Sequence, residues 1–270
     1  MRIIKDLPYA QYGDRVMLLD LYLPDAPTGL VPAILCVVGG GWRSTDKAGY
    51  AEAGQGIAQN GYVAAAITYR SSTDTIAPGN VHDCKAAVRW LRANAATYGI
   101  DPTRIGALGG SAGAHLVALL GTTNGRQELE GNGGNPAQSS AVQAVCEFCG
   151  PVDLTRGAQP ALRKKYPVLY ECVEAYLGGP LDKRMELAKL VSPLRYVSPA
   201  SAPMLIIHGD ADDIVSVEES IVFYDALKKA GVDATLHVAK GATHDLTWST
   251  YGNQVVAFFR RTLTNKKESD

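Results

Sequence analysis

A serine between glycines is the group in this 270-residue chain whose surroundings most clearly predict chemistry. Ser111 lies in Gly109-Gly110-Ser111-Ala112-Gly113, directly after an apolar run and directly before a helical pattern. A serine on a sharp strand-to-helix turn needs small neighbours, because side chains there would collide with the adjacent backbone. The turn raises Oγ above the sheet edge, and the N-terminus of the next helix favours negative charge. We predict that Ser111 is a nucleophile; the alternative is a helix N-cap.

A nucleophilic serine needs a base, and the base needs a partner that fixes its tautomer. His244 is the one histidine that follows the last apolar run, on Ala239-Lys240-Gly241-Ala242-Thr243-His244. Three carboxylates follow the preceding run: Asp210, Asp212 and Asp213. We expect His244 to be the base and Asp212 the acid. Asp210, which could instead brace the loop, and Asp213, which could be solvated, remain alternatives for the acid.

The other four histidines favour structural roles. His208 ends an apolar run, which is typical of a buried, hydrogen-bonded imidazole. His82 lies early on a predicted helix, His115 one turn after Ser111, and His237 within a predicted strand. None of them follows the last strand, which is where the base belongs in the order serine, acid, histidine.

A glycine run offers backbone donors for a reacting carbonyl. Gly39-Gly40-Gly41-Trp42 follows the apolar stretch 33–38, and no Gly-Lys-Ser/Thr comes after it, so a phosphate loop is excluded. An N–H of this loop and the N–H of Ala112, after the nucleophile, could together form an oxyanion hole. Each such donor stabilises a transition state by about 3–4 kcal/mol. The alternative is a glycine-rich turn without a role in chemistry.

The elements that must position these residues alternate along the chain, as in a parallel α/β sheet. We predict strands over 16–23, 33–38, 62–67, 104–108, 142–148, 204–208 and 234–238, and helices over 46–60, 81–98, 217–230 and 248–263 and directly after Ser111. Residues 121–136 are expected to form a loop. Residues 155–198, with four prolines, interrupt the alternation as a helical, cap-like insertion, and residues 1–270 form a single domain.

Composition limits the function classes. Hydrophobic residues make up 46% and charged residues 20%, with a formal net charge of −1, so the chain can bury a core and has no basic run for nucleic acid or anionic lipid. Residues 1–6 lack the apolar core of a signal peptide, and no stretch approaches about 20 apolar residues. We expect a cytoplasmic protein without a membrane span, or a secreted one if a leader has been removed. The Cys146-Glu147-Phe148-Cys149 spacing favours buried small hydrophobes over a redox or metal pair.

Several motifs together resemble a known family. They are Gly39-Gly40-Gly41-Trp42, Tyr69-Arg70, the stretch 81–92, Gly110-Ser111-Ala112-Gly113-Ala114-His115-Leu116, Gly150-Pro151-Val152-Asp153-Leu154 and His208-Gly209-x-x-Asp212. These are similar to the feruloyl esterase/acetylxylan esterase-like branch of the α/β-hydrolases related to hormone-sensitive lipase. The resemblance implies Ser111 as nucleophile, Asp212 as acid, His244 as base, and Gly40, Gly41 and Ala112 as oxyanion donors. One position departs: Val38 stands where the family loop usually begins with histidine, which puts the bracing of the loop in question.

These observations predict an α/β-hydrolase-fold serine carboxylesterase that uses an acyl-enzyme and needs no metal or cofactor. The resemblance suggests small acetyl or feruloyl-type esters of carbohydrate or aryl alcohols, and is compatible with a homodimer. We expect residues 121–140 and 155–198 to set the substrate. Two alternatives stay open: an arylformamidase or peptidase of the same fold, and a binding homologue that has lost the reaction.

Overall fold

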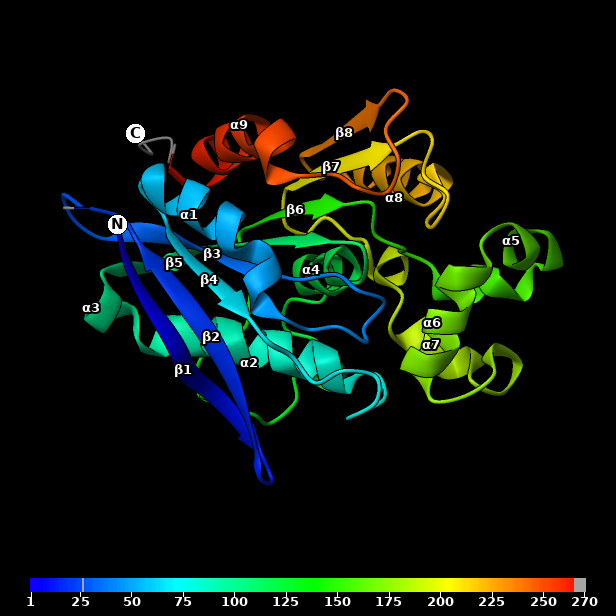
Figure 1. The fold of residues 1–270 in the computed structure, drawn as a ribbon, viewed down its shortest axis with the longest axis horizontal. Coiled ribbons are helices and arrows are strands. Elements are labelled where there is room, and N and C mark those ends of the chain that lie inside the picture. Colours follow the sequence, from blue (N-terminus) through cyan, green and yellow to red (C-terminus); the bar gives the residue numbers. More distant parts are fainter. Residues whose placement is uncertain (26, 265–270) are drawn as a thin grey trace.

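An eight-stranded sheet forms the centre of the computed structural model, which describes residues 1–25 and 27–264 (Figure 1). The strand order is β1-β2-β4-β3-β5-β6-β7-β8. The strands are β1 (Arg2–Tyr12), β2 (Arg15–Leu23), β3 (Val31–Val37), β4 (Val63–Ile67), β5 (Ile100–Gly110), β6 (Ala144–Phe148), β7 (Met204–Gly209) and β8 (Ala234–Ala239). β1 pairs antiparallel with β2 and β2 with β4, whereas all strands from β4 to β8 in the spatial order are parallel.

Helices cover both faces of the sheet, which explains why its central strands are continuously apolar. α1 (Ala51–Gln59) and α9 (Trp248–Phe259) pack on one face, while α2 (Gly79–Ala93), α4 (Ala112–Thr122) and α8 (Val217–Lys229) pack on the other; the short α3 (Ala95–Tyr98) follows α2 (Figure 1). Every residue of β4, β6 and β7 is buried. The predicted α/β-hydrolase fold, with its mostly parallel sheet, is confirmed.

Two element predictions were wrong in detail. Strand β1 was not predicted, because most of its side chains are exposed and register shifts on both sides of Leu7 break the alternation that marks a half-buried strand. The single helix expected over 46–60 is a 3₁₀ turn, Lys47–Tyr50, followed by α1. Asp46 caps this turn, accepting a hydrogen bond from the N–H of Ala48 at 2.9 Å.

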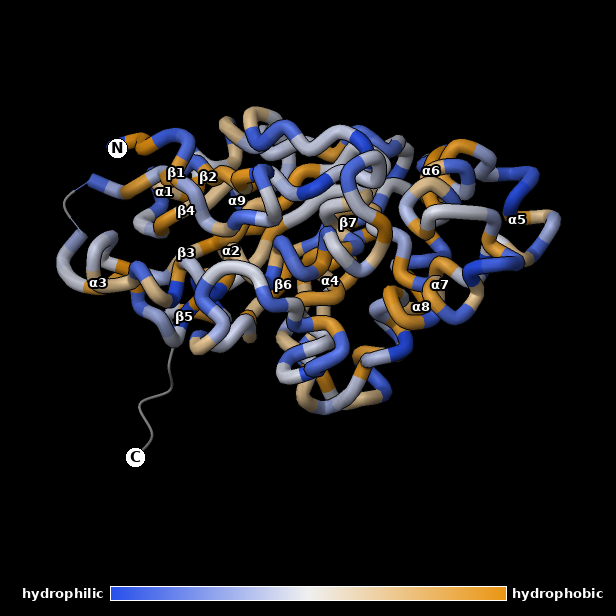
Figure 2. The backbone as a smooth tube through the Cα atoms, turned by 90° about the horizontal axis from the view of Figure 1, so that it is seen from below, coloured by the Kyte–Doolittle hydropathy of each residue, from blue (hydrophilic) through white to orange (hydrophobic). Residues whose placement is uncertain are grey.

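The segment that interrupts the alternation is helical. It contains α5 (Pro160–Lys165), α6 (Pro167–Leu177) and α7 (Met185–Leu190), together with the 3₁₀ turns Leu154–Ala158, Leu181–Lys183 and Pro193–Tyr196. α5, α6 and α7 lie together at one end of the molecule in both Figure 1 and Figure 2. That these residues form a cap-like insertion in one domain over 1–270 remains our proposal, and residues 265–270 lie outside the described part of the chain.

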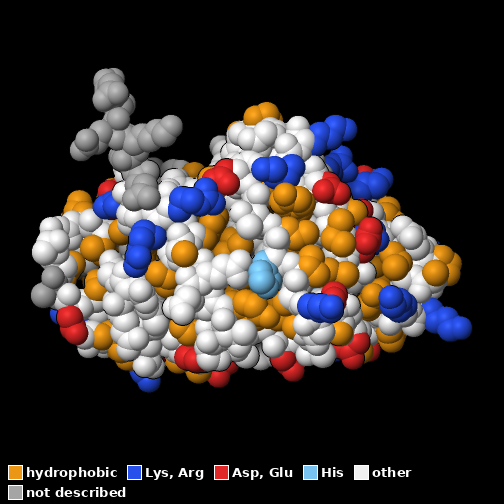
Figure 3. All heavy atoms as spheres, turned by 90° about the horizontal axis from the view of Figure 1, so that it is seen from above, with side chains coloured by type: hydrophobic (Ala, Val, Ile, Leu, Met, Phe, Trp, Pro, Cys, Tyr) orange, Lys and Arg blue, Asp and Glu red, His pale blue; other side chains and the backbone are white. Residues whose placement is uncertain are grey.

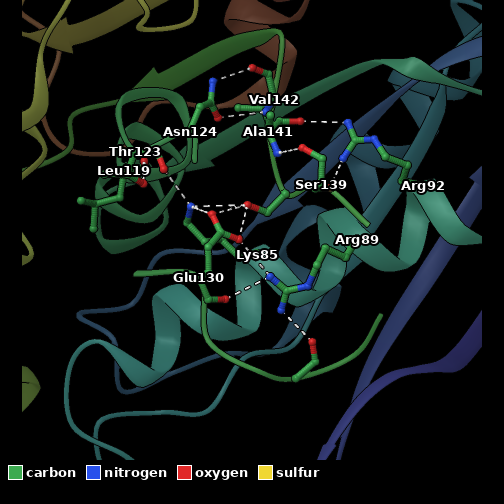
Figure 4. Close-up of polar contacts among 12 residues, drawn as sticks. Lys85, Arg89, Arg92, Leu119, Thr123, Asn124, Glu130, Ser139, Ala141 and Val142 are labelled. Atoms are coloured by element: carbon green, nitrogen blue, oxygen red, sulfur yellow. Dashed lines mark hydrogen bonds and ion pairs between the residues drawn. The ribbon is translucent and has the colours of Figure 1, made fainter. Parts of the chain in front are cut away.

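The loop between α4 and β6 is fixed to α2 by charged side chains (Figure 4). Lys85 Nζ donates to Thr123 O at 3.0 Å and to Glu130 Oε1 at 2.7 Å. Arg89 Nη1 donates to Glu130 Oε2 at 3.2 Å and Arg89 Nη2 to Gly133 O at 2.7 Å. The side chains of Lys85 and Arg89 are 0% and 2% exposed. This buried group is called the α2 charge cluster below.

The surface of the described residues carries both signs of charge. On the face drawn in Figure 3, lysine and arginine side chains are interspersed with aspartate and glutamate among hydrophobic ones. Among the helices of residues 1–25 and 27–264, none combines the length and apolar character needed to cross a bilayer.

Candidate active site

Four strand ends bring the predicted residues together. β3, β5, β7 and β8 are parallel, so their C-terminal ends lie at one edge of the sheet. The glycine loop follows β3, Ser111 follows β5, Asp212 follows β7 and His244 follows β8. Ligands in open α/β folds bind at this edge.

Ser111 occupies a tight turn with unusual backbone angles, φ 54° and ψ −121°. The residues two positions before and after it can only be glycine: a Cβ on Gly109 would lie 2.4 Å from Gly113 O, and a Cβ on Gly113 would lie 2.0 Å from Val37 O. The N–H of Ser111 donates to Phe148 O at 2.8 Å, which fixes the turn to β6. A positive φ on serine costs free energy, and such strain concentrates at functional sites.

Ser111, His244 and Asp212 form one hydrogen-bonded chain. His244 Nε2 accepts from Ser111 Oγ at 2.9 Å, and His244 Nδ1 donates to Asp212 Oδ2 at 2.7 Å. The second carboxylate oxygen, Oδ1, accepts from the N–H groups of Ile214 and Val215, both at 2.8 Å. The imidazole is therefore held in the tautomer that can take a proton from serine.

Asp212 is held as a carboxylate although its side chain is 0% exposed. Burial alone opposes ionisation, but hydrogen bonds from His208, His244 and the Val215 N–H outweigh it and hold the pKa of Asp212 well below its usual range. His244 itself is 20% exposed, so its ring stays reachable from solvent.

The two alternative acids do not contact His244. Asp210 accepts from the N–H of Gly241 at 2.6 Å and so ties the end of β7 to the histidine loop, and Asp213 is exposed. His208 is fully buried, as expected, and accepts from Ser220 Oγ at 2.6 Å. Its Nε2 also lies 3.2 Å from Asp212 Oδ2, a contact with the acid that sequence reasoning missed.

The predicted oxyanion donors lie beside the serine. Gly40 and Gly41 have φ of +94° and +60°, which glycine adopts without strain. The N–H groups of Gly40, Gly41 and Ala112 donate to no described residue. Ala112 begins α4, where N–H groups have no partner within the helix and favour negative charge. The arrangement offers free donors next to Ser111.

Other groups hold the glycine loop where Val38 provides no side-chain hydrogen bond. The hydroxyl of Tyr69 donates to Val38 O at 3.0 Å and lies 3.4 Å from Gly39 O. The N–H groups of Arg43 and Ser44 both donate to Gly40 O, at 3.0 and 3.2 Å. The bracing expected from a histidine side chain is thus supplied by a tyrosine and by the backbone.

Trp42 anchors the far end of this loop. Its ring is 1% exposed and stacks on Tyr176 of α6 with centroids 4.6 Å apart. Its Nε1 donates to His115 Nδ1 at 3.3 Å, and His115 Nε2 donates to Val191 O at 2.7 Å. Burial lowers the pKa of His115 to about 4, so the ring is neutral and can make both bonds. This bridge was missed, although His115 lies one helical turn after Ser111 and could have indicated it.

The other two histidines lie away from the chain of hydrogen bonds. His82 is on α2, and His237 on β8 packs against Tyr251 with ring centroids 5.8 Å apart. Both positions agree with the structural roles expected of them.

The two cysteines of the Cys146-Glu147-Phe148-Cys149 segment have different surroundings. Cys146 is in the core between sheet and α9, and Cys149, with φ 47°, lies beside the histidine loop, its Sγ 3.6 Å from His244 O. Cys149, Asp212 and His244 place potential metal ligands within 4.8 Å of one another. His244 Nδ1 and Asp212 Oδ2 are already bonded to each other, so the donor set favours proton transfer rather than a metal site.

A buried carboxyl lies behind the site. Glu147 of β6 is 0% exposed; its Oε2 accepts from the N–H of Gly150 at 2.9 Å, and its Oε1 has no partner among the described residues. Burial raises the pKa of Glu147 from 4.5 to about 7, with the charge of Glu219 adding to the rise.

Two cavities meet at Ser111 and His244. The histidine-side cavity, of about 300 Å³, is lined by both of these and by Tyr50, Glu52, Phe148, Leu246, Thr247 and Trp248, among others. The cap-side cavity, of about 480 Å³, is lined by both and by Gly40, Gly41, Val168, Leu169, Cys172 and Ile214, among others. No lining residue of either comes from 121–140, so the expected role of that loop in setting the substrate was wrong: the α2 charge cluster holds it elsewhere.

The chain is similar to proteins of known class. The family model described as BD-FAE matches residues 19–227. Among curated relatives, Esterase LipQ of Mycobacterium tuberculosis is 34% identical over 87% of this chain and 55% of its own length. The probable carboxylic ester hydrolase LipM of the same organism is 32% identical over 83% of this chain and 51% of its own. The chain thus spans about half the length of these curated relatives.

Two solved structures match over nearly their whole length. A truncated form of a carbohydrate esterase from gut microbiota is 30% identical, with a TM-score of 0.86, covering 98% of this chain and 97% of that one. Esterase Est2 of Thermogutta terrifontis is 29% identical, with a TM-score of 0.80, covering 97% of this chain and 94% of that one.

Proposed function

The chain belongs to the BD-FAE family, and from this premise we propose that it is a serine carboxylesterase that hydrolyses small acyl esters of carbohydrate, acetyl or feruloyl-type, through an acyl-enzyme. The observation that carries the proposal is the hydrogen-bonded chain from Ser111 through His244 to Asp212, with unpaired N–H groups beside it. Nucleophile, base, orienting acid and oxyanion donors are the four parts that acyl transfer requires.

The proposed reaction has two steps. His244 Nε2 takes the proton from Ser111 Oγ, and the oxygen attacks the ester carbonyl carbon. The oxyanion that forms is stabilised by the N–H groups of Gly40, Gly41 and Ala112. His244 then gives its proton to the departing alcohol oxygen, which leaves an acyl group on Ser111. In the second step a water, deprotonated by His244, attacks the acyl carbon. The bond from that carbon to Ser111 Oγ breaks, the carboxylic acid leaves, and His244 returns the proton to Ser111 Oγ.

The low pKa of Asp212 supports this scheme. A carboxylate stabilises the imidazolium that forms twice in each cycle, and the hydrogen bonds to Asp212 keep it ionised. The base must accept the serine proton at Nε2, and this is the nitrogen that already lies 2.9 Å from Ser111 Oγ.

The choice of ester and sugar rests on similarity. A structural neighbour that aligns with 98% of this chain is a carbohydrate esterase, and curated relatives are named esterases. Aryl esters share the same acyl chemistry and serve as convenient reporters. A Ser-His-Asp triad could also attack amides, but no feature of the described residues favours an amide over an ester.

The experiment is hydrolysis of 4-nitrophenyl acetate and of acetylated xylan by wild type and by Ser111→Ala. We expect release of nitrophenol and acetate by the wild type, and a loss of kcat on the order of a millionfold in the variant. Ser139→Ala, a hydroxyl loss at an exposed serine that lines neither cavity, is the matched control and should hydrolyse like the wild type. Equal rates for Ser111→Ala and wild type would contradict the proposal.

A further inference from the structure

The two cavities at Ser111 differ in what lines them, and this difference can orient the substrate. The histidine-side cavity presents the phenol of Tyr50, the carboxylate of Glu52, the hydroxyl of Thr247 and the indole of Trp248. Both Tyr50 and Glu52 line this cavity, Glu52 is exposed, and neither the Tyr50 hydroxyl nor the Glu52 carboxylate makes a hydrogen bond within the described residues. Polar groups without partners at a cavity wall are available to bind hydroxyl groups, and an indole face can stack on a sugar ring.

The cap-side cavity is apolar. Val168, Leu169 and Cys172 reach it from α6, and Ile214 from the loop after Asp212. The charged group at its wall, Arg43, is paired with Glu171 at 3.1 Å. Cys172 packs directly on the oxyanion loop, since a Cβ on Gly41 would lie 2.7 Å from Cys172 Sγ. Burying apolar groups here is favourable at roughly 25 cal/mol per Å².

The chemistry of the two steps indicates which cavity holds the alcohol and which holds the acyl group. The alcohol oxygen must lie near His244 Nε2, because this nitrogen gives it the proton with which the alcohol departs. The histidine-side cavity is built from that loop, with Leu246, Thr247 and Trp248 following His244. The carbonyl oxygen must reach the oxyanion donors, and Gly40, Gly41 and Ala112 line only the cap-side cavity. The carbonyl carbon carries both the alcohol oxygen and the acyl group, so an alcohol on the histidine side leaves the cap-side cavity for the acyl group.

We propose that the cap-side cavity binds the acyl group and the histidine-side cavity a polyhydroxyl alcohol, so that the enzyme prefers apolar acyl groups longer than acetyl on sugar-like alcohols. This inference rests on the proposed function. Val168 of α6 limits the length of the acyl group, and Glu52 of α1 accepts hydrogen bonds from hydroxyl groups of the alcohol. An acetyl group, with one methyl, would leave most of a cavity of about 480 Å³ empty.

The acyl arm of the test uses one leaving group and three acyl groups: 4-nitrophenyl acetate, butyrate and hexanoate. Val168 is 53% exposed, so Val168→Trp can fill the cavity without disturbing the core. We expect kcat/KM for hexanoate to fall about tenfold or more relative to acetate, since excluding a few methylenes costs this much. Val238→Trp is the matched control: Val238 is 43% exposed on β8 and lines neither cavity.

The alcohol arm uses one acyl group and three alcohols: butyrate esters of 4-nitrophenol, ethanol and glucose. Glu52→Gln should lower kcat/KM for the glucose ester about tenfold relative to the ethyl ester, the size expected for losing hydrogen bonds to a charged group. Glu128→Gln, at an exposed glutamate away from both cavities, is the control.

The outcomes separate the two claims. The orientation is supported if Val168→Trp changes only the acyl preference and Glu52→Gln changes only the alcohol preference. A change of alcohol preference in Val168→Trp, or of acyl preference in Glu52→Gln, overturns it while leaving the esterase proposal intact. A wild type that hydrolyses none of these esters, and whose Ser111 takes up no fluorophosphonate, overturns the proposed function and the orientation together.

Discussion

The Ser111 site and the α2 charge cluster are both networks of largely buried polar groups, yet they differ in what they leave unpaired. In the cluster, Lys85 makes contacts with Thr123 O, Glu130 and Ser140, and both carboxylate oxygens of Glu130 are bonded. At the site, the N–H groups of Gly40, Gly41 and Ala112 donate to no described residue, and His244 is 20% exposed.

The cluster also has one buried nitrogen without a partner, Arg89 Nε, but its charged groups are paired with one another, whereas the donors beside Ser111 are free. A buried network in which the charges are paired fixes a loop, because breaking any bond leaves a charge without a partner. A network with free donors, a strained serine and a reachable imidazole has its polar groups ready for a substrate that supplies the missing partners. A change that removes a charge should therefore lower the rate of catalysis at the Ser111 site, and the stability of the fold in the α2 charge cluster.

The largest effect expected is at Asp212. Asp212→Asn keeps the size of the side chain but removes the negative charge that orients and stabilises His244, so kcat should fall about ten-thousandfold, measured on nitrophenyl esters. The circular dichroism spectrum should stay that of the wild type. Asp213→Asn, at the adjacent exposed carboxylate, should keep wild-type activity. Similar losses in both variants would show that Asp212 has no special role.

Next in size is the loss of the cation at Lys85. Lys85→Met fills the same space but leaves Glu130 with Arg89 as its only cation, and the free energy of unfolding should fall by about 3 kcal/mol, the lower end of the range for breaking a buried pair. Denaturant unfolding measures this, and kcat/KM of the folded variant should match the wild type. Lys164→Met, at an exposed lysine of α5, should leave stability unchanged. A stable Lys85→Met protein with a large loss of activity would reverse the comparison.

The smallest effect expected is a pH dependence of the unfolding free energy that arises from Glu147. This carboxyl is buried behind the site, and one of its oxygens lacks a partner among the described residues. Its pKa rises from 4.5 in the unfolded chain to about 7 in the fold, so the fold favours the protonated form. Its stabilising contribution is full below pH 4.5 and is lost as pH rises through 7, in all about 3 kcal/mol as an upper value.

Glu147→Gln tests this, since glutamine stays neutral and can still accept from Gly150. The difference in unfolding free energy between variant and wild type, measured from pH 5 to pH 8.5, should grow in favour of the variant as pH rises. A difference that stays constant over this range would show that Glu147 titrates in the fold as it does in the unfolded chain.

Much of the site was predictable because its residues are tied to strand ends. Continuous apolar runs predicted the parallel strands, and a parallel sheet brings the ends after β5, β7 and β8 to one edge. Gly109 and Gly113 predicted the turn at Ser111, since nothing larger fits there. His244 was singled out by its position after the last strand, and Asp212 by the same logic with two alternatives that the geometry separates.

What was missed depends on contacts between distant segments. Tyr50 and Glu52 line the same cavity as His244 because the 3₁₀ turn and α1 come together with α9 across the sheet face, and no local pattern indicates this. The bridge from Trp42 through His115 to Val191 spans 149 positions and needs the cap segment in place. Loop 121–140 looked like a substrate-binding segment because it is long and irregular, whereas Lys85 and Arg89 hold it against α2. β1 was missed because its exposed, bulged backbone shows no alternation.

Phosphonylation of the nucleophile tests the central claim most directly. Wild type and Ser111→Ala are incubated with a fluorophosphonate, and each protein is weighed by intact mass spectrometry, followed by peptide mapping. The account predicts one adduct per wild-type chain, located on Ser111, with loss of esterase activity in proportion to labelling and no adduct on the variant. An unlabelled wild type that still hydrolyses esters, or an adduct on any other residue, would contradict it.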